Sequence, residues 1–418
     1  MKIPELYGYF TAHFLVDTDT RKIRKNSLFF ALKGDNFNGN AFAAKALELG
    51  AKYAVVDEKK YKTHATIFLV DNVLKTLQEL AAYHRKQLKT TIIGLTGSNG
   101  KTTTKELMHA VLSKHYKTVA TQGNLNNHIG VPLTLLSITP DTEIGIIEMG
   151  ANHQKEIEFL SNICAPDYGY ITNFGKAHLE GFGGVAGVIK GKSELYDFLE
   201  KKQKTAFINP EDTIQVEKTA SLKTIPFENS IAFIEANPLV KVNYQNITIA
   251  SQLIGAYNYS NIAIAITLGH YFKVAPKDIQ SAIEEYVPTN NRSQIITQGT
   301  NTIILDAYNA NPSSMQVALE NFKQLKATSK GVILGDMFEL GSESEREHQA
   351  IVDLADSLDF EFCWYVGEHF YNTNTSKQQF LRYTDVEDYI KSQSLEGQTI
   401  LIKGSRGMRL ERIVTHIS

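Results

Sequence analysis

Hydrophobic residues recur along the chain in two alternating patterns. Short continuous apolar runs, typical of strands buried on both faces, are followed by stretches in which apolar positions return every three or four residues, as on one face of a helix. In residues 72–87, for example, Val73, Leu77, Leu80 and Ala81 would share one helix face. Alternation of strands and helices is typical of a mostly parallel sheet covered by helices on both faces. The pattern therefore predicts an α/β fold.

The alternation divides into three regions, which we interpret as three domains. We expect a small α/β N-terminal domain in residues 1–90, a central parallel-sheet domain in residues 91–291 and a Rossmann-like α/β C-terminal domain in residues 292–418. The polar, turn-like segment at 286–292 would link the last two. The predicted strands are 27–33, 53–57, 91–96, 143–150, 168–172, 302–308, 332–336, 362–367 and 399–404. The predicted helices are 40–49, 72–87, 101–115, 185–202 and 258–272, and a β-rich insert is expected at 220–252.

Composition excludes several classes of protein. Of the 418 residues, 43% are hydrophobic and 21% are charged, which is near the globular average and excludes disorder as the dominant state. The net charge of −2 argues against a general nucleic-acid binder. Cys164 and Cys363 are too few for a disulfide framework or a thiolate metal site. Because no apolar run reaches about 18 residues and the N-terminus has no secretory apolar stretch, we expect a cytoplasmic protein without membrane insertion.

The charges are unevenly distributed. Residues 1–90 hold 15 Lys or Arg against 9 Asp or Glu, a net charge of +6, whereas the remainder has a net charge of −8. A basic first domain suits an anionic ligand. A chance bias of the surface explains the same charge equally well.

The strongest chemical signal is a glycine-bearing loop between a predicted strand and a predicted helix. Glycines let backbone N–H groups approach phosphate oxygens, and the helix N-terminus adds partial positive charge. Lys101 would contact the β- and γ-phosphates and the Thr102 hydroxyl would ligate Mg²⁺. Leu95 replaces the first glycine of the usual phosphate-loop pattern, so an ordinary βα turn is the alternative. The proposed phosphate-binding residues are Gly97, Ser98, Asn99, Gly100, Lys101, Thr102 and Thr103.

Three further residues are candidates for a role in catalysis. Glu148 ends a predicted strand and could complete a Mg²⁺–ATP site, although a carboxylate at a strand end is more often exposed. His178 would emerge at the same sheet edge, where open α/β sheets bind ligands, or would be a polar loop residue. Lys192 lies in a helical stretch, where a solvated face is the plain interpretation.

Polar residues gather at two more helix starts and after the last strand. Asn258 and Asn261 begin an apolar helix, which they would either cap or extend with amide groups toward a nucleobase. Residues 305–315 hold a strand-to-helix loop in which Asn311-Pro312 is a signal for the start of a helix. Residues 403–408 form a basic turn suited to a carboxylate, a phosphate or solvent. The side chains concerned are Asp306, Asn309, Asn311, Lys403 and Arg406.

Taken together, these segments resemble the Mur ligases of peptidoglycan synthesis over essentially the whole chain. The resemblance is carried by TGSNGKTTTKE (96–106), GNLNNHIGVPLTLL (123–136), EMGANHQKEI (148–157), ITNFGKAHLEGFG (171–183) and GAYNYSNIAIAITLG (255–269). Within the family, residues 18–47, 305–315 and 334–348 look like the branch that adds D-Ala-D-Ala to UDP-N-acetylmuramoyl-tripeptide. The resemblance implies an ATP-dependent ligase that makes an amide bond through an acyl phosphate. A ligase adding glutamate or a diamino acid, and a non-catalytic nucleotide switch, remain alternatives.

The resemblance also implies a role for each candidate residue. Lys101, Glu148, His178 and Lys192 would be catalytic. Two Mg²⁺ ions would be held by Thr102, Glu148, His178 and a carbamate that carbon dioxide forms on Lys192. Beyond the phosphate loop, ATP would contact Asn258, Asn261, Arg292 and Asp306. The muramoyl-peptide and acceptor substrates would contact Thr20, Arg21, Lys33, Asn126, Asn127, Asn309, Asn311, Lys403 and Arg406. The third domain would close over the second, and we expect the chain to act as a monomer.

Overall fold

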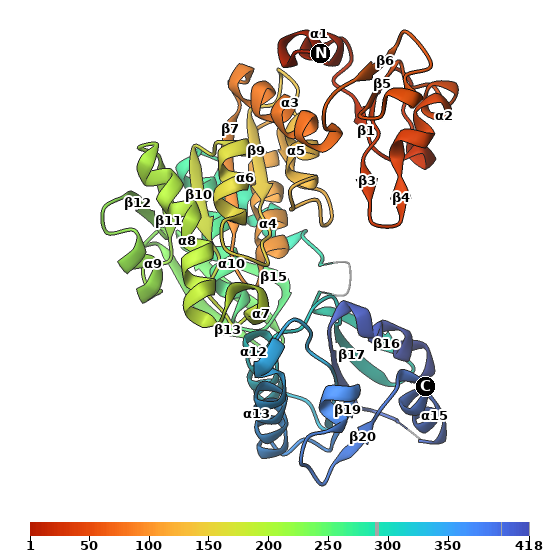
Figure 1. The fold of residues 1–418 in the computed structure, drawn as a ribbon. Coiled ribbons are helices and arrows are strands. Elements are labelled where there is room, and N and C mark those ends of the chain that lie inside the picture. Colours follow the sequence, from red (N-terminus) through yellow and green to blue (C-terminus); the bar gives the residue numbers. More distant parts are fainter. Residues whose placement is uncertain (289–291, 394, 418) are drawn as a thin grey trace.

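The computed structural model describes residues 1–288, 292–393 and 395–417. It contains three α/β units joined in chain order, with the first and third units at different ends of the central unit (Figure 1). Each predicted strand and helix is found, with its ends displaced by a few residues. The α/β prediction is therefore confirmed. Within the segment expected to link the last two units, residues 289–291 lie outside the described part of the chain.

The first unit is a small parallel sheet with helices around it. The sheet has the strand order β1-β2-β5-β6, with every neighbouring pair parallel, and a separate hairpin is formed by β3 and β4. The strands are β1 (Val16–Asp17), β2 (Leu28–Phe30), β3 (Lys33–Gly34), β4 (Phe37–Asn38), β5 (Tyr53–Val56) and β6 (Ile67–Leu69). The helices are α1 (Ile3–Thr11), α2 (Ala43–Glu48) and α3 (Val73–Gln87).

The central unit is built on an all-parallel sheet in the order β12-β11-β10-β7-β9-β8. Its strands are β7 (Thr91–Thr96), β8 (Thr118–Ala120), β9 (Ile144–Glu148), β10 (Tyr168–Ile171), β11 (Thr205–Ile208) and β12 (Lys223–Pro226). Its helices are α4 (Lys101–Ser113), α5 (Gly130–Leu136), α6 (Glu156–Cys164), α7 (Leu179–Phe182), α8 (Val185–Lys201), α9 (Thr213–Lys218), α10 (Asn258–Tyr271) and α11 (Pro276–Glu284). The β-rich insert is the antiparallel sheet of β13 (Ile231–Ala236), β14 (Leu239–Tyr244) and β15 (Ile247–Ile254).

Helices cover both faces of the central sheet, as the continuous apolar strands require. Successive residues of a strand point to opposite faces, so Ile92 packs in a core with α5, α6 and α8, whereas Ile93 packs with α4 and α10. Helix α10 is buried along almost its whole length between α4 and the insert. This arrangement explains why the apolar residues of α10 are spread around the helix rather than confined to one face.

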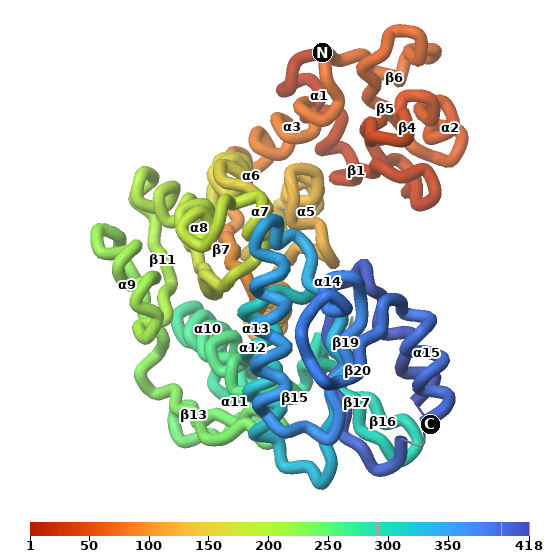
Figure 2. The backbone as a smooth tube through the Cα atoms, turned by 60° about the horizontal axis from the view of Figure 1, so that its bottom comes forward, coloured from red at the N-terminus to blue at the C-terminus, as the bar shows by residue number. Residues whose placement is uncertain are grey.

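The third unit has a mixed sheet in the order β16-β17-β21-β18-β19-β20, parallel except for the edge pair β16–β17. Its strands are β16 (Gln294–Gln298), β17 (Asn301–Asp306), β18 (Lys330–Gly335), β19 (Phe362–Val366), β20 (Gln378–Phe380) and β21 (Thr399–Lys403). Its helices are α12 (Pro312–Gln324), α13 (Ser344–Ser357), α14 (Glu368–Tyr371) and α15 (Tyr383–Ser392). Helices α12 and α13 run along the side of this unit that meets the central unit (Figure 2).

Helix α3 packs against both the first unit and the central unit. Asn72 caps its first turn by accepting a hydrogen bond from the Lys75 N–H at 2.8 Å. Its apolar face packs on α1 and also on α5 and α6 of the central unit. Near its end, the buried His84 lies between the Tyr7 hydroxyl at 3.1 Å and the Ile138 carbonyl at 2.9 Å. Burial lowers the pKa of His84. The chain passes from one sheet to the next near residue 90 without a break in the core.

The described helices include none that is long and apolar enough to cross a membrane.

The shared helix gives a stability prediction. Leu80 is fully buried in the core that joins the first two units, so replacing it with Ala removes packing from both. We expect Leu80→Ala to lower the free energy of unfolding by about 2–5 kcal/mol in urea denaturation. Glu79→Ala, on the exposed side of the same helix, should change it by less than about 0.5 kcal/mol. Equal effects of the two substitutions would contradict the shared core.

Candidate active site

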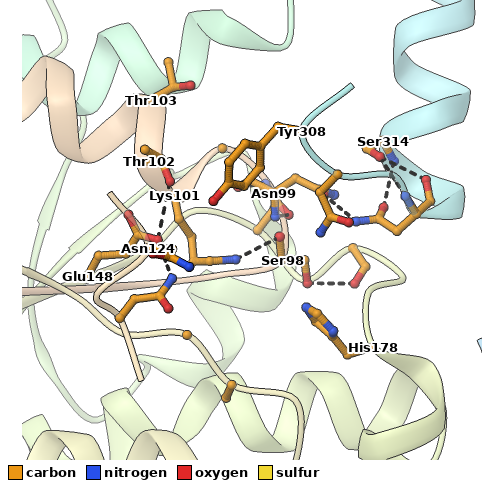
Figure 3. A pocket seen from close by; sticks show the side chains of 18 of the residues that line it. Ser98, Asn99, Lys101, Thr102, Thr103, Asn124, Glu148, His178, Tyr308 and Ser314 are labelled. Atoms are coloured by element: carbon orange, nitrogen blue, oxygen red, sulfur yellow. Dashed lines mark hydrogen bonds between the residues drawn. The ribbon is translucent and has the colours of Figure 1, made fainter. Parts of the chain in front are cut away.

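A large cleft lies where the central and third units meet. Its volume is about 1140 Å³. The phosphate loop and the strand ends of the central unit form one wall, and the loop before α12 forms the other (Figure 3). Of the predicted site residues, those lining the cleft are Ser98, Asn99, Gly100, Lys101, Thr102, Thr103, Asn126, Asn127, Glu148, His178, Asn258, Asn261, Arg292, Asp306, Asn309, Asn311 and Lys403.

The glycine-bearing loop has the geometry that phosphate binding requires. Gly97 has a φ of +142°, and a Cβ there would lie 2.0 Å from Thr172 Oγ1, so only glycine fits against the end of β10. Gly100 has a φ of +77° and directly precedes α4. No side chain of the described residues caps the first turn of α4. Its N–H groups are therefore directed at the cleft, where an anion would be stabilised.

Lys101 is folded back over this loop. Its Nζ donates hydrogen bonds to the carbonyl oxygens of Gly97 at 2.7 Å and Ser98 at 3.1 Å. Burial lowers the pKa of Lys101, the charge of Glu148 opposes that shift, and the charge of Arg292 adds to it. The ammonium group thus lies at the mouth of the loop, beside the position that phosphate oxygens would take.

Glu148 is buried, so the interpretation of it as an exposed strand-end residue is wrong. It is 1% exposed. Its Oε1 accepts hydrogen bonds from Asn126 Nδ2 at 2.8 Å and from Thr102 Oγ1 at 3.4 Å. Its Oε2 is also buried and has no hydrogen-bond partner among the described residues. A buried carboxylate oxygen without a partner is costly, and a bound cation would satisfy it.

Lys192 is also buried, so the solvated-face interpretation of its helix is wrong at this position. The residue is 0% exposed. Its Nζ donates to the Ala151 carbonyl at 3.1 Å and lies 4.9 Å from the centre of the Phe182 ring. Burial lowers its pKa well below the usual value, and the nearby charge of Lys101 adds to this effect. The amine lies behind Ala151, which itself lines the cleft.

The Nδ1 side of His178 faces the third unit, and the residue also lines the cleft. It has a φ of +52° and directly precedes α7. Its Nδ1 contacts the carboxylate of Glu339, and the pKa of Glu339 is lowered by this imidazole. In the described residues, no three His, Cys, Asp or Glu side chains converge as a metal-binding group. Of the four predicted ligands, Glu148 and His178 belong to these residue types, and Thr102 lies within hydrogen-bond distance of Glu148.

Two basic side chains of the third unit have different environments. Lys403 is 2% exposed, and its Nζ donates to Asp306 Oδ2 at 2.5 Å. The predicted nucleotide contact of Asp306 would therefore compete with this ion pair. Arg406 lies in an exposed turn outside the cleft lining, where its Nη1 donates to the Tyr308 hydroxyl at 3.1 Å. Arg292 stacks on the same Tyr308 ring, 3.7 Å from its centre.

Asn311 joins the phosphate loop to the third unit. Its side chain caps α12 by accepting from the Ser314 N–H at 2.9 Å, which confirms the predicted signal for the start of a helix. Its Nδ2 donates to Asn99 Oδ1 at 2.7 Å. Asn309 Oδ1 accepts a hydrogen bond from the Ala310 N–H.

The interpretation of Asn258 and Asn261 as helix caps is wrong. Both lie within the first turn of α10 and are buried. Asn258 Nδ2 donates to the Ile254 carbonyl, and Asn261 Nδ2 donates to Asn258 Oδ1. Asn261 Oδ1 accepts from Thr104 Oγ1 at 2.8 Å, which ties α10 to the helix that follows the phosphate loop.

The residues of the first unit that were predicted to contact substrate do not line the cleft in this structure. Arg21 is exposed and paired with Asp19, and Lys33 pairs with Asp57 at 2.8 Å and Glu58 at 3.1 Å. Thr20 begins a short 3-10 turn beside Arg21. At the cleft rim, Asn127 Oδ1 accepts from the N–H groups of Ile129 and Gly130.

Sequence reasoning missed three residues of the site. Asn173 Oδ1 accepts from the Asn99 N–H at 3.1 Å and so braces the phosphate loop. Tyr308 is held between two guanidinium groups, and Glu339 contacts His178. All three lie inside segments 171–183, 305–315 and 334–348. The sequence could have indicated them only through their position next to predicted site residues in these segments. No rule of residue spacing predicts the contacts that they make.

Comparison with known proteins finds Mur ligase relatives along most of the chain. Residues 12–87 match the profile "Mur ligase family, catalytic domain", residues 95–269 match "Mur ligase middle domain", and residues 291–406 match "Mur ligase, glutamate ligase domain". The UDP-N-acetylmuramoyl-tripeptide–D-alanyl-D-alanine ligase of Bacillus subtilis is 36% identical, with 96% of this chain and 92% of that protein covered. The enzyme of the same name from Escherichia coli is 32% identical, covering 98% and 95%.

Solved structures agree with these matches. A crystal structure of MurF from Acinetobacter baumannii has a TM-score of 0.84 and 29% identity, covering 96% of this chain and 92% of that one. A MurF ligase from Thermotoga maritima in complex with ADP has the same fold, with a TM-score of 0.84, 24% identity and 96% of each chain covered. The phosphate loop, the cleft and the full-length matches together establish that this chain belongs to the Mur ligases, a family of ATP-dependent enzymes that form amide bonds.

Proposed function

We propose that this ligase joins D-alanyl-D-alanine to UDP-N-acetylmuramoyl-tripeptide and cleaves ATP to ADP and phosphate. The observation that carries the proposal is the cleft, because a phosphate loop from one unit faces a basic, amide-rich wall from another. The names of the full-length relatives support the same pair of substrates. The product would be a precursor for peptidoglycan synthesis.

The chemistry requires activation of the tripeptide carboxylate. A carboxylate is a poor acyl donor because it would have to expel oxide, so its oxygen first attacks the γ-phosphate of ATP to give an acyl phosphate and ADP. The amine of D-Ala-D-Ala then attacks the acyl carbon, and the tetrahedral intermediate collapses by expelling phosphate. Most of the catalysis would come from positioning and from charge neutralisation.

We assign ATP to the phosphate-loop side of the cleft. Residues 97–103 would hold its phosphates, with Lys101 moving from the loop carbonyls to the β- and γ-phosphate oxygens. Arg292 would add a second cation from the third unit. Asn258 and Asn261 lie beneath the loop at the adenine side, and Asp306 is assigned to the ribose, which requires its ion pair with Lys403 to loosen.

The residues around Glu148 fit a divalent cation. Its Oε2, to which no described residue donates a hydrogen bond, and the Thr102 hydroxyl are hard oxygen donors of the kind that Mg²⁺ prefers. When bound, Mg²⁺ would neutralise the charge that gathers as the carboxylate and phosphates approach one another. His178 and a carbamylated Lys192 are assigned to a second ion.

The environment of Lys192 fits the carbamate. Carbon dioxide reacts with a neutral amine, and burial shifts Lys192 toward its neutral form. The carbamate would carry a negative charge, so a buried cation would be replaced by an oxygen ligand. The change would place that ligand beside Ala151 at the cleft wall.

The remaining assignments concern the acceptor, the nucleotide sugar and the assembly. We place D-Ala-D-Ala near Asn309, Asn311, Lys403 and Arg406, the tripeptide along Asn126 and Asn127, and the uridine diphosphate at Thr20, Arg21 and Lys33. We thus assign residues 1–90 to binding of the UDP-muramoyl-peptide, residues 91–291 to binding of ATP, and residues 292–418 to the amino acceptor and to closure over ATP. The first unit's net charge of +6 suits a diphosphate. We expect a monomer acting in the cytoplasm.

The proposed function is tested by acceptor-dependent release of ADP. With UDP-N-acetylmuramoyl-tripeptide and ATP present, adding D-Ala-D-Ala should raise ADP release by at least about a hundredfold over the reaction without it. Glutamate and diamino acids are the matched controls, because relatives in this family add them and one matching profile is named for glutamate. Stimulation by glutamate or a diamino acid instead of D-Ala-D-Ala would overturn the assignment of the acceptor.

Lys101 tests the phosphate loop. Because the ammonium group would neutralise charge in the transition state, Lys101→Ala should lower kcat by at least about a hundredfold. Lys114→Ala, a matched change at the far end of the same helix, should leave kcat within about twofold. Circular dichroism should show both variants folded. A folded Lys101→Ala protein with normal turnover would rule out the assigned role.

The carbamate is tested without turnover. Protein equilibrated with carbon-13 bicarbonate should show one protected carbamate resonance by NMR, and Lys192→Ala should lack it. Lys190→Ala, a neighbouring lysine of the same helix, should retain it. A resonance that survives in Lys192→Ala would place the modification elsewhere.

A further inference from the structure

Residues 336–341 of the third unit extend from the end of β18 onto the loop that carries His178. They belong to the segment 334–348 that the sequence singled out and to which no role has been assigned. Glu339, in this segment, has a φ of +62°. Its Oε2 contacts His178 Nδ1, and its backbone carbonyl accepts from the Glu180 N–H at 3.3 Å. Both the side chain and the backbone of Glu339 therefore engage the His178 loop.

Two further contacts hold the same loop against the third unit. Lys176 Nζ lies 2.8 Å and 3.1 Å from the two carboxylate oxygens of Glu347, whose side chain is almost fully buried. The Lys176 N–H donates to Ser313 Oγ at 2.7 Å. Residues 176–180 are thus contacted by segment 336–341, by α13 and by α12. His178 lies in the middle of these residues.

The segment that presents Glu339 is itself braced. The Met337 N–H donates to His348 Nε2 at 3.0 Å, and the Phe338 N–H donates to Ser405 Oγ at 3.1 Å. The Ser405 N–H in turn donates to the Asp336 carbonyl at 3.1 Å. Ser405 lies between Lys403 and Arg406, the basic residues assigned to the acceptor. Hydrogen bonds therefore connect the segment that carries Glu339 to that part of the site.

A carboxylate at Nδ1 has a defined effect on a histidine. It holds the proton on Nδ1, fixes the plane of the ring and leaves the Nε2 lone pair free for a cation. His178 needs such support, because it lies in a loop with a left-handed backbone conformation and its ring has no partner from its own unit among the hydrogen bonds of the described residues. Glu339 supplies the support from a different unit.

We propose that Glu339 is a positioning residue: it orients His178 toward the metal end of the cleft, and it does so only when the third unit is docked on the central one. Docking of the acceptor-bearing unit thereby completes the ATP site. The inference rests on the proposed function, since it assigns His178 to the Mg²⁺–ATP end of that site.

The competing explanation is that Glu339 only attaches the two units to each other. The two explanations differ in what happens to molecules that are already docked. A positioning residue alters the affinity for the cation in the docked state, whereas a residue that only attaches the units alters how many molecules are docked. A test must therefore measure cation affinity and docking separately.

The test compares Glu339→Gln with Glu345→Gln in the full chain. Both substitutions remove one carboxylate from the same segment, and Glu345 is exposed at the start of α13. Binding of Mn²⁺ to the ADP-loaded protein is followed by electron paramagnetic resonance, without turnover. Docking is followed by the distance between spin labels at Lys202→Cys and Ser376→Cys, both exposed, because the native Cys164 and Cys363 are buried.

We expect Glu339→Gln to weaken Mn²⁺ binding by about tenfold and to lower kcat by about tenfold, with a smaller change in KM for ATP. These losses should exceed any fall in the docked fraction. Glu345→Gln should match the wild type in all measurements. Unchanged Mn²⁺ affinity in Glu339→Gln, or losses that only follow the docked fraction, would overturn the proposal. ADP release that depends on D-Ala-D-Ala in the wild type and in Glu345→Gln tests the proposed function independently.

Discussion

The parallel pairing of β7 with β9 and β10 sets the positions of the phosphate loop, of Glu148 and of the loop that leads to His178. In this register Leu95 lies opposite Glu148, and Thr96 lies opposite Ile171. The three strands therefore end at the same level, and the loops that follow them meet at one edge of the sheet. The phosphate loop begins at Gly97, the carboxylate of Glu148 points to it, and the loop after β10 braces it through Asn173. A shift of one residue in either pairing would turn Glu148 or the loop bracing away from the phosphates.

Burial near this edge of the central sheet then affects the charge states of the lysine side chains there. Removing Lys101 and Lys192 from water disfavours their ionised forms unless partners are present. The protein supplies only part of that compensation: Lys101 bonds to loop carbonyls, and Lys192 bonds to a single carbonyl, while one oxygen of Glu148 has no partner among the described residues. The interactions that the protein leaves incomplete are those that we propose for phosphate, a divalent cation and carbon dioxide.

The third unit completes the cleft through few but directed contacts. Asn311 reaches Asn99 in the phosphate loop, Glu347 reaches Lys176, and Glu339 reaches His178. These contacts are polar, and Asn99, Asn311 and His178 among them line the cleft. The third unit also makes apolar contacts, because the buried cluster that joins the first and central units through α3 extends to Ile304, Met315 and Leu340. Both junctions of the central unit are therefore partly apolar.

The sequence alone determined the α/β class, the sites of most strands and helices, and the phosphate loop, because these follow from local periodicity and from glycine and lysine at a strand-to-helix turn. It also indicated the start of α12 at Asn311-Pro312, which is a local signal. Local reasoning favoured a metal role for Glu148 over an exposed carboxylate, but it interpreted Lys192 as a solvated lysine and left Asn258 and Asn261 open between helix caps and nucleobase contacts. Only the tertiary structure decided that these side chains are buried and which atoms they meet. Burial and partner choice depend on packing between elements far apart in the chain, as with Thr104 and Asn261 or His178 and Glu339, and no spacing along the sequence records such a contact.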